Sequence, residues 1–530
     1  MNTRNPQKAK KSGSEEIAKS NVDGSPKPRV YCLTGIDPEI HAYAMAKYSR
    51  SALSMKEALQ ELSHQKAEHF LNTLYFQYGH RSIADLAHLS FAIENVSMLA
   101  AITIVDEPRW DGQERSSRYQ NFKSSGYFVP DLSDNVKSEF TVIVSKLFEA
   151  YEDLSEACFN HFARLVPKPA DLDDNKYKRT IRARAFDIAR YLLPLATNTS
   201  VGQIVSARTL EAQISRLAGD DHPELCDIAG MLKEAANSTP YDLRVERLER
   251  VLESLKAREE KFNFSAFDEF LSRPAVAPTL VKYAEATEYD GKTKCEISEA
   301  AKELMQGVQI EASEAVNLVE PETLEIEVAA TLLYERSHHS YRQIVQAVSS
   351  LPAQRRQEIL SLGVKHRGPY DELSRPYAAG QSFQFDVLMD IGGFRDLHRH
   401  RRCIQILQSY TTAHGYEMPD TVDVVGRADR FQRLMGDCGA LWEVMTSTSN
   451  GKRASNADYV LPLAFRRRAL FKMDFAEVVY ICELRTAASG HPSYRRVAYA
   501  MYDELKRKYP VLSSAARIQD RDSSVDLLKR

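Results

Sequence analysis

The sequence predicts an α+β fold in which one domain occurs twice in tandem, each copy combining a mixed sheet with long helices. Short matches recur in the same order, at spacings from 268 residues (Leu193 to Leu461) to 289 residues (Tyr127 to Tyr416). Ordered recurrence of this kind indicates a duplicated structural unit. The matches are Tyr48-x-Arg50-Ser51 with Tyr334-x-Arg336-Ser337, His80-Arg81 with His366-Arg367, Tyr127-x-x-Pro130-Asp131 with Tyr416-x-x-Pro419-Asp420, Leu193-Pro194-Leu195-Ala196 with Leu461-Pro462-Leu463-Ala464, and Arg216 before His222-Pro223 with Arg485 before His491-Pro492.

Strand and helix patterns follow one another within each copy. Aromatic and β-branched residues predict short strands at 88–93 and 383–388. Asn95 and Asp390 come directly after these strands and are suited to cap the helices that we expect next. Longer amphipathic helices are predicted at 182–195 and 457–476. Helices therefore predominate in the expected fold.

The duplication divides the chain into five segments. Its first residues are rich in Lys, Ser, Asn and Pro and contain no apolar core, which is typical of a disordered tail. Between the copies, a leucine stripe within residues 242–261 predicts a linker helix. We expect a tail at 1–29, a first domain at 30–237, a helical linker at 238–320, a second domain at 321–515 and a tail at 516–530.

Composition is typical of a soluble globular protein. The hydrophobic fraction is 43%, the charged fraction 27% and the net charge −3, so any basic site must be local. The seven cysteines form no C-x-x-C pair and no zinc-type cluster. We therefore expect a cytoplasmic protein without a metal site. No apolar run approaches the roughly 18 residues that span a membrane, so no membrane association is expected.

A dense basic stretch in the second copy is the first candidate site. On a helix, Arg395, Arg399 and Arg402 would fall on one face, with Asp396 able to offset part of their charge. Arginine at this density favours planar, bidentate recognition of phosphate or carboxylate. A solvated basic face is the alternative interpretation of the same pattern.

The two copies differ where chemistry is expected. The first copy carries a dense polar turn at 113–119 but lacks the arginine stripe, since its corresponding helix ends in Asp106-Glu107. The second copy has the stripe, but its following loop at 403–410 lacks the glutamate and the arginine. Each copy therefore holds what the other lacks. Pairing between Glu114 and Arg118 within a polar turn remains the alternative interpretation.

Together these residues resemble the signature of the flavin-dependent thymidylate synthases, the ThyX family. That signature places arginine-histidine-arginine directly before Asn-Glu-x-Ser-x-Arg-Tyr. Here Arg399-His400-Arg401 is similar to the first part, and the Glu-x-Ser-x-Arg-Tyr type of loop in the first copy is similar to the second. The resemblance covers roughly residues 30–235 and 325–515. It implies a double-length member with the motif divided between two ThyX-like domains.

The resemblance implies reductive methylation of dUMP to dTMP, in the biosynthesis of dTMP. Methylene-tetrahydrofolate would supply the carbon, reduced FAD the hydride, and NADPH would reduce the flavin. Family members are homotetramers whose sites combine several subunits, so the resemblance implies a homo-oligomer here, a dimer that mimics the tetramer. The alternative is a catalytically degenerate protein that binds nucleotide or flavin in a regulatory or structural role. A nucleic-acid-binding module is disfavoured by the net charge of −3.

The resemblance also implies roles for individual residues, with the flavin and the substrate contacting different sets. Arg485 and Ser116 would act on the pyrimidine as catalytic residues, although His491, beside the flavin, could equally be structural. Cofactor contacts are implied for Arg399, His400, Arg401, Arg208 and His491, and substrate contacts for Glu114, Ser116, Arg118, Arg190, Arg395 and Arg485.

The second copy departs from the family pattern at several positions. Asp458 stands at the counterpart of Arg190, and this reversal of charge would repel a phosphate. Asp396 stands where the family usually has glutamine. Substrate binding is therefore expected at Arg190 and not at Asp458.

Overall fold

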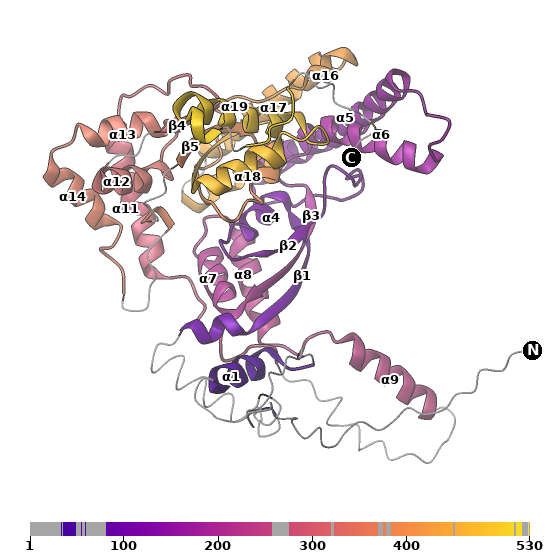
Figure 1. Ribbon diagram of the computed structural model, residues 1–530, viewed down its shortest axis with the longest axis vertical. Helices are drawn as coiled ribbons and strands as arrows, with labels where there is room; N and C mark the ends of the chain where they lie inside the picture. Colours follow the sequence, from indigo (N-terminus) through magenta and orange to yellow (C-terminus); the bar gives the residue numbers. More distant parts are fainter. Residues whose placement is uncertain are drawn as a thin grey trace, which may run out of the picture.

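The protein folds into two units that pack against each other, and each unit combines one sheet with helices (Figure 1). The computed structural model describes residues 33, 35–48, 55, 59, 81–256, 275–319, 323–368, 375–377, 383–448, 451–513, 516–521 and 528. The tail expected at 1–29 and the repeat residues Arg50, Ser51 and His80 lie outside the described residues. The α+β class and the duplication are confirmed.

The first copy begins with a helix and then alternates strands with helices. Two long helices, α5 and α6, lie between strands β2 and β3 in the chain, and the copy closes with the helical pair α7 and α8. The elements are α1 (Pro38–Tyr48), η2 (Arg81–Leu86), β1 (His88–Ser97), α4 (Met98–Ile104), β2 (Asp111–Glu114), α5 (Asp134–Leu165), α6 (Asp174–Ala189), η3 (Arg190–Leu192), β3 (Asn198–Ser206), α7 (Ala207–Ala218) and α8 (Pro223–Ala236).

The second copy repeats this order after a helical connection. The connection contains α9 (Leu243–Lys256), which forms within the predicted linker helix, and α11 (Glu288–Leu304). The copy comprises β4 (Val316–Val319), α12 (Leu324–Tyr334), α13 (Tyr341–Ser349), α14 (Ala353–Leu362), η5 (Arg375–Tyr377), β5 (Phe383–Asp390), α15 (Ile391–Leu397), β6 (Ile404–Leu407), α16 (Asp420–Val424), α17 (Ala428–Thr448), η6 (Gly451–Val460), β7 (Arg466–Met473), α18 (Phe475–Arg485), α19 (Pro492–Lys508) and α20 (Pro510–Ser513).

Each copy has its own sheet, and every described strand pair is antiparallel, so the expected mixed sheet is two antiparallel sheets. The first has the order β1-β3-β2 and the second β4-β5-β7-β6. The registers agree, since Glu114 of β2 pairs with Val201 and Leu407 of β6 pairs with Ala469. These two pairs occupy the same place in their respective sheets. Strand β4 comes from the segment expected as linker and pairs with β5.

The repeated Leu-Pro-Leu-Ala segments join the copies about a local twofold axis. Leu195 N donates to Leu461 O at 2.9 Å, and Leu463 N donates to Leu193 O at 2.9 Å. Pro194 and Pro462 form the bridge at the centre of this pairing. The four leucines are fully buried, and one hydrophobic core runs through both copies. The duplication therefore builds an internal dimer.

Three local predictions were wrong. The helix predicted at 182–195 ends at Ala189, and the one predicted at 457–476 contains strand β7, because its arginines and lysine pair within the second sheet. The cap of α4 is Ser97, whose hydroxyl accepts from Ala100 N. Asn95 lies in β1 with a φ of 58°, beside a break in the strand register.

The first residues of α4 and of α15 are held by similar polar networks, in which the hydroxyl and the carboxylate have exchanged places. Ser97 Oγ donates to Glu224 at 2.6 Å, and Tyr459 of the other copy donates to the same carboxylate at 2.9 Å. At the start of α15 the carboxylate is on the cap, Asp390, and the hydroxyl is on Ser493 of α19. Each helix start is thus tied to a later helix of its own copy.

A partly buried cluster of one histidine and two aspartates also crosses the twofold axis. His222, the cap of α8, contacts Asp220 at 2.7 Å and Asp458 of the second copy at 3.3 Å. Burial alone would lower the pKa of His222, but hydrogen bonds to Asp220 and Asp458 raise it to about 10. The charged imidazolium therefore bridges two carboxylates between the copies.

We predict that the charge on His222 stabilises the protein most below pH 6.5 and progressively less as the pH rises. Because the folded-state pKa of His222 exceeds its ordinary value of 6.5, its contribution is complete below pH 6.5 and is lost as the pH rises to about 10. The gap in free energy of unfolding between wild type and His222→Gln, measured by urea denaturation, should narrow across that range. The control variant His161→Gln, on α5, should differ little from wild type in free energy of unfolding at every pH. A constant gap for His222→Gln would contradict the prediction.

Candidate functional site

A pocket of about 700 Å³ lies where the first sheet faces the end of α15. The first copy provides the ends of β2 and β3 and the start of α7, and the second copy provides the arginines after Phe394. This size lies within the range of about 300–1,000 Å³ that is usual for cofactor sites. The lining residues are Asp85, His88, Val105, Pro108, Arg109, Trp110, Asp111, Gly112, Gln113, Glu114, Ile204, Val205, Ser206, Thr209, Arg395, His398, Arg399 and Arg401.

Helix α15 is short, and its start is held tightly. Asp390 caps it as predicted, accepting from Gly393 N at 2.6 Å. A Cβ on Gly393 would lie 2.4 Å from Ser493 Oγ, so glycine is required there for close packing against α19. The helix ends at Leu397. The prediction of one helical arginine face was therefore wrong, because Arg399 and Arg402 lie beyond the helix.

Because α15 ends at Leu397, the side chains of Arg395, Arg399 and Arg402 point in different directions. Arg399 is exposed at the pocket, and it forms no hydrogen bond or ion pair with the part of the chain that the structure describes. Arg402 points away and pairs with Asp474 at 3.1 Å on the surface. Arg395 reaches back across the twofold axis.

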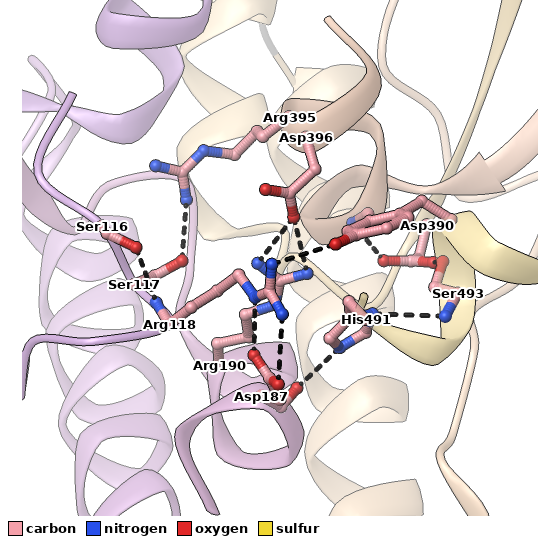
Figure 2. A network of polar contacts seen from close by, with 12 residues as sticks. Ser116, Ser117, Arg118, Asp187, Arg190, Asp390, Arg395, Asp396, His491 and Ser493 are labelled. Atoms are coloured by element: carbon pink, nitrogen blue, oxygen red, sulfur yellow. Dashed lines mark hydrogen bonds and ion pairs between the residues drawn. The ribbon is translucent and has the colours of Figure 1, made fainter. Parts of the chain in front are cut away.

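Arg395 joins the two halves of the divided motif. Its guanidinium forms an ion pair with Glu114 of β2. It also lies 3.4 Å from Ser117 Oγ (Figure 2). Both partners come from the first copy, and both charged side chains are largely buried. Glu114 therefore pairs with Arg395 and not with Arg118, so the interpretation of a self-contained polar turn was wrong.

Arg401 forms the other wall of the pocket. Its guanidinium stacks over the Trp110 ring at 4.3 Å and donates to Val105 O at 2.6 Å. Burial lowers the pKa of Arg401 to about 10, and the neighbouring positive charge of Arg399 adds to this effect. An anion between these two guanidinium groups would relieve their repulsion.

A second group of predicted residues lies deeper, in the network of Figure 2. Arg118 pairs with Asp187, Nε to Oδ1 at 2.8 Å, and Arg190 pairs with Asp396 of the second copy at 3.2 Å. His491 contacts Asp187 O at 2.9 Å. Burial, assisted by Arg190, lowers the pKa of His491 to about 3, so this imidazole is neutral. Asp396 therefore contacts Arg190 rather than the neighbours expected on its own helix.

His400 and Arg485 connect the two groups. His400 contacts Glu477 through Nδ1 at 3.1 Å, and its Nε2 accepts from Arg485 Nε at 2.8 Å. Burial lowers the pKa of His400, which keeps it neutral and able to accept. The ring of Tyr494 lies near both Arg485, at 5.3 Å, and Arg118, at 5.6 Å.

Two predicted residues lie at the edges. Ser116 Oγ accepts from Arg118 N at 3.3 Å, which shapes the turn before Arg118. Arg208, at the start of α7, pairs with Asp85 at 3.2 Å, and Asp85 itself lines the pocket. The pocket lining does not include His400 or Arg485, and it does not include the deeper arginines Arg118 and Arg190.

The matching region on the other side of the twofold axis is built differently. Met98 N donates to Thr197 O as Ile391 N donates to Phe465 O, which places Asp106 at the counterpart of Arg399. Asp106 accepts from Arg375 of η5 at 2.7 Å, and Arg375 also donates to Gln405 O at 3.3 Å. An internal ion pair thus occupies this region, where the first site has the exposed Arg399.

Sequence reasoning missed three residues of the site. Asp187 and Tyr494 lie within helices, where nothing in their spacing distinguishes them from ordinary partly buried positions. Trp110 lies three residues before the polar turn, and a rare aromatic residue at that place was an available signal. Among the described residues, no cluster of three or more His, Cys, Asp or Glu side chains is arranged to hold a metal. No helix in the described ranges could cross a membrane.

Similar proteins fall into two groups by length. A protein of Chlamydia muridarum named UPF0159 protein is 26% identical over 521 residues, covering 93% of this chain and 92% of the relative. One of Thermoplasma acidophilum with the same designation is 23% identical over 515 residues, covering 90% and 94%. The flavin-dependent thymidylate synthase of Clostridium tetani is 25% identical over 177 residues, covering 33% of this chain and 67% of the relative.

A solved structure of thymidylate synthase X from Helicobacter pylori, with FAD and dUMP, matches 37% of this chain and 88% of its own, with 15% identity and a TM-score of 0.23. The sequence model of the family described as "Thymidylate synthase complementing protein" matches residues 33–240 and again residues 318–511. The two matches together cover most of the chain and coincide with the two copies. The chain therefore belongs to the thymidylate synthase complementing protein family, in a double-length form with two tandem domains.

Proposed function

We propose that this protein is a flavin-dependent thymidylate synthase that converts dUMP to dTMP, with one composite site in each chain. Family membership supports the fold and the reaction class. The observation that carries the proposal is the ion pair between Arg395 and Glu114, which reunites the divided motif beside a pocket of about 700 Å³. Neither copy could build this site alone.

The residues that line the pocket fit FAD. Arg399 has no partner in the described chain, and burial lowers the pKa of Arg401 to about 10, so both would gain from an anionic diphosphate. Trp110 offers an aromatic face beside Gly112, where a Cβ would lie 2.6 Å from the indole. We assign cofactor binding to Arg399 and Arg401, with Arg208 at the rim and His400 and His491 behind the pocket. Bound FAD, once reduced by NADPH, would supply the hydride that completes the methyl group taken from methylene-tetrahydrofolate.

We assign the substrate side to the deeper network and to the turn that leads into it. Arg485 would bind the pyrimidine and favour its anionic form, and His400 holds the Arg485 guanidinium through a 2.8 Å hydrogen bond. Ser116 would lie close to the pyrimidine. Arg118 and Arg190 would meet the phosphate, and Arg395 with Glu114 would separate the substrate from the cofactor.

Assembly and location follow from the same proposal. One chain contains two family domains about a local twofold axis, so two chains would equal the family tetramer. We therefore propose a homodimer. A cytoplasmic location is proposed because the seven cysteines form no C-x-x-C pair, as is typical of a protein in a reducing compartment.

A spectrum of the purified protein tests the proposal and its site count. We predict flavin absorbance with one FAD per chain, because the counterpart region holds the Asp106–Arg375 pair in place of Arg399, which has no partner among the described residues. Protein and flavin concentrations after denaturation give the ratio. Addition of dUMP should shift the flavin bands.

FAD binding and growth rescue decide between the proposal and its alternatives. A colourless protein that takes up no added FAD would contradict the proposal, and two FAD per chain would contradict the single composite site. Growth of a thymidine-requiring bacterium without its own thymidylate synthase, rescued by this chain, would exclude a degenerate binding protein. Failure to rescue with FAD bound would favour that alternative.

The separated arginines offer a matched pair of variants. We predict that Arg399→Ala weakens FAD binding about tenfold or more, since it removes an anion contact in the pocket. Arg402→Ala should change binding by less than about twofold, because this exposed arginine pairs with Asp474 outside the pocket. Fluorescence titration of the apoprotein with FAD measures both.

The same titration tests the assignment of the deeper network. Arg118→Ala should leave FAD affinity within about threefold of wild type and weaken dUMP, because Arg118 does not line the pocket. Equal losses of FAD affinity for Arg399→Ala and Arg402→Ala would refute the assignment of Arg399. Identical phenotypes for Arg399→Ala and Arg118→Ala would refute the division between cofactor and substrate sides.

A further inference from the structure

Asp396 lies where several arginines of the site converge. Its Oδ2 accepts from Arg190 Nη1 at 3.2 Å and Nη2 at 3.3 Å. Burial alone would raise the pKa of Asp396, but Arg190, Arg118 and Arg399 act together to hold it below its ordinary value. The surrounding arginines therefore favour a negative charge at this position.

The ion pair with Asp396 leaves Arg190 incompletely satisfied. Both terminal nitrogens of Arg190 donate to the same carboxylate oxygen, and its Nε is buried without a partner among the described residues. Arg190 is only 2% exposed, so an unused donor there is costly. A phosphate group, with three or four oxygens, suits a guanidinium better than one carboxylate oxygen does.

The charges of Arg118 and Arg190, the two arginines assigned to the phosphate, are balanced without any ligand. Two guanidinium groups, Arg118 and Arg190, are opposed by Asp187 and Asp396. His491 adds no charge, because burial and Arg190 lower its pKa to about 3. A phosphate dianion that approaches these two arginines meets a neutral cluster, and it must compete with a carboxylate for either guanidinium.

We propose that Asp396 competes with the substrate phosphate for Arg190, and so sets how strongly the site distinguishes a nucleotide from its nucleoside. This inference rests on the proposed function, since it takes a phosphorylated pyrimidine nucleoside as the ligand. The nucleotide binds by displacing the Asp396 carboxylate from Arg190. The nucleoside leaves that ion pair in place and binds without its cost.

Asp396→Asn tests this competition. The amide keeps an oxygen that accepts from Arg190 but removes the negative charge, so the phosphate gains and the nucleoside does not. We expect dUMP to bind about tenfold tighter or more than to wild type, and deoxyuridine to change by less than about threefold. Calorimetric titration of the FAD-loaded protein measures both ligands.

Two further variants serve as a control and as an independent repeat of the charge removal. Asp437→Asn makes the same chemical change at an exposed position on α17, and it should alter neither affinity. Asp396→Gln removes the charge with a longer side chain that still accepts from Arg190, and it should show the same preference for dUMP. Thermal unfolding of each variant establishes that it is folded before the titrations.

The outcomes separate this inference from the proposed function. Unchanged or weaker dUMP binding by folded Asp396→Asn or Asp396→Gln, with wild type binding dUMP, overturns the competition and leaves Asp396 as a structural partner of Arg190. Equal gains for dUMP and deoxyuridine also overturn it. Absence of both FAD and dUMP binding in wild type overturns the proposed function itself, and this inference with it.

Discussion

The pairing of the two Leu-Pro-Leu-Ala segments is the constraint on which the rest of the structure depends. Four backbone hydrogen bonds between 2.9 and 3.1 Å join Leu193, Leu195 and their neighbours to the matching residues of the second copy. Because these groups are buried, each unpaired amide or carbonyl would be costly, so the relative position of the copies is tightly specified. Every contact of the site across the twofold axis relies on that position.

Across this joint, charges of one copy are neutralised by the other. Arg395 pairs with Glu114, Arg190 with Asp396 and His222 with Asp458, and each pair has one member in each copy. A buried charge that loses its partner typically costs about 3–5 kcal/mol. The copies are therefore mutually dependent in charge as well as in their shared core. Such coupling explains why a duplicated chain can divide one motif between its halves without losing either part.

The two regions that the local twofold axis relates have the same backbone arrangement but different charged residues. On one side, exposed Arg399 and stacked Arg401 border a pocket. On the other side, Asp106 replaces Arg399 and is held by Arg375, and Asp458 replaces Arg190 and is held by His222. Each replacement reverses a charge, and each reversed charge has acquired a partner of opposite sign within the chain. An open site and a closed, self-satisfied region are the result.

The sequence by itself determined the fold class, the duplication and the division of the motif, because recurrence and residue type are properties of the chain. It also identified Asp390 as a helix cap, since that bond joins neighbours three residues apart. Only the tertiary structure decided that α15 ends at Leu397, and that Asp396 contacts Arg190 rather than its helical neighbours. Strand β7 escaped prediction because its buried charges pair with residues distant in the chain, as Arg468 does with Asp386 of β5 and Lys472 with Glu327 of α12. Partners more than 200 residues apart are chosen by packing about the twofold axis, which local patterns do not encode.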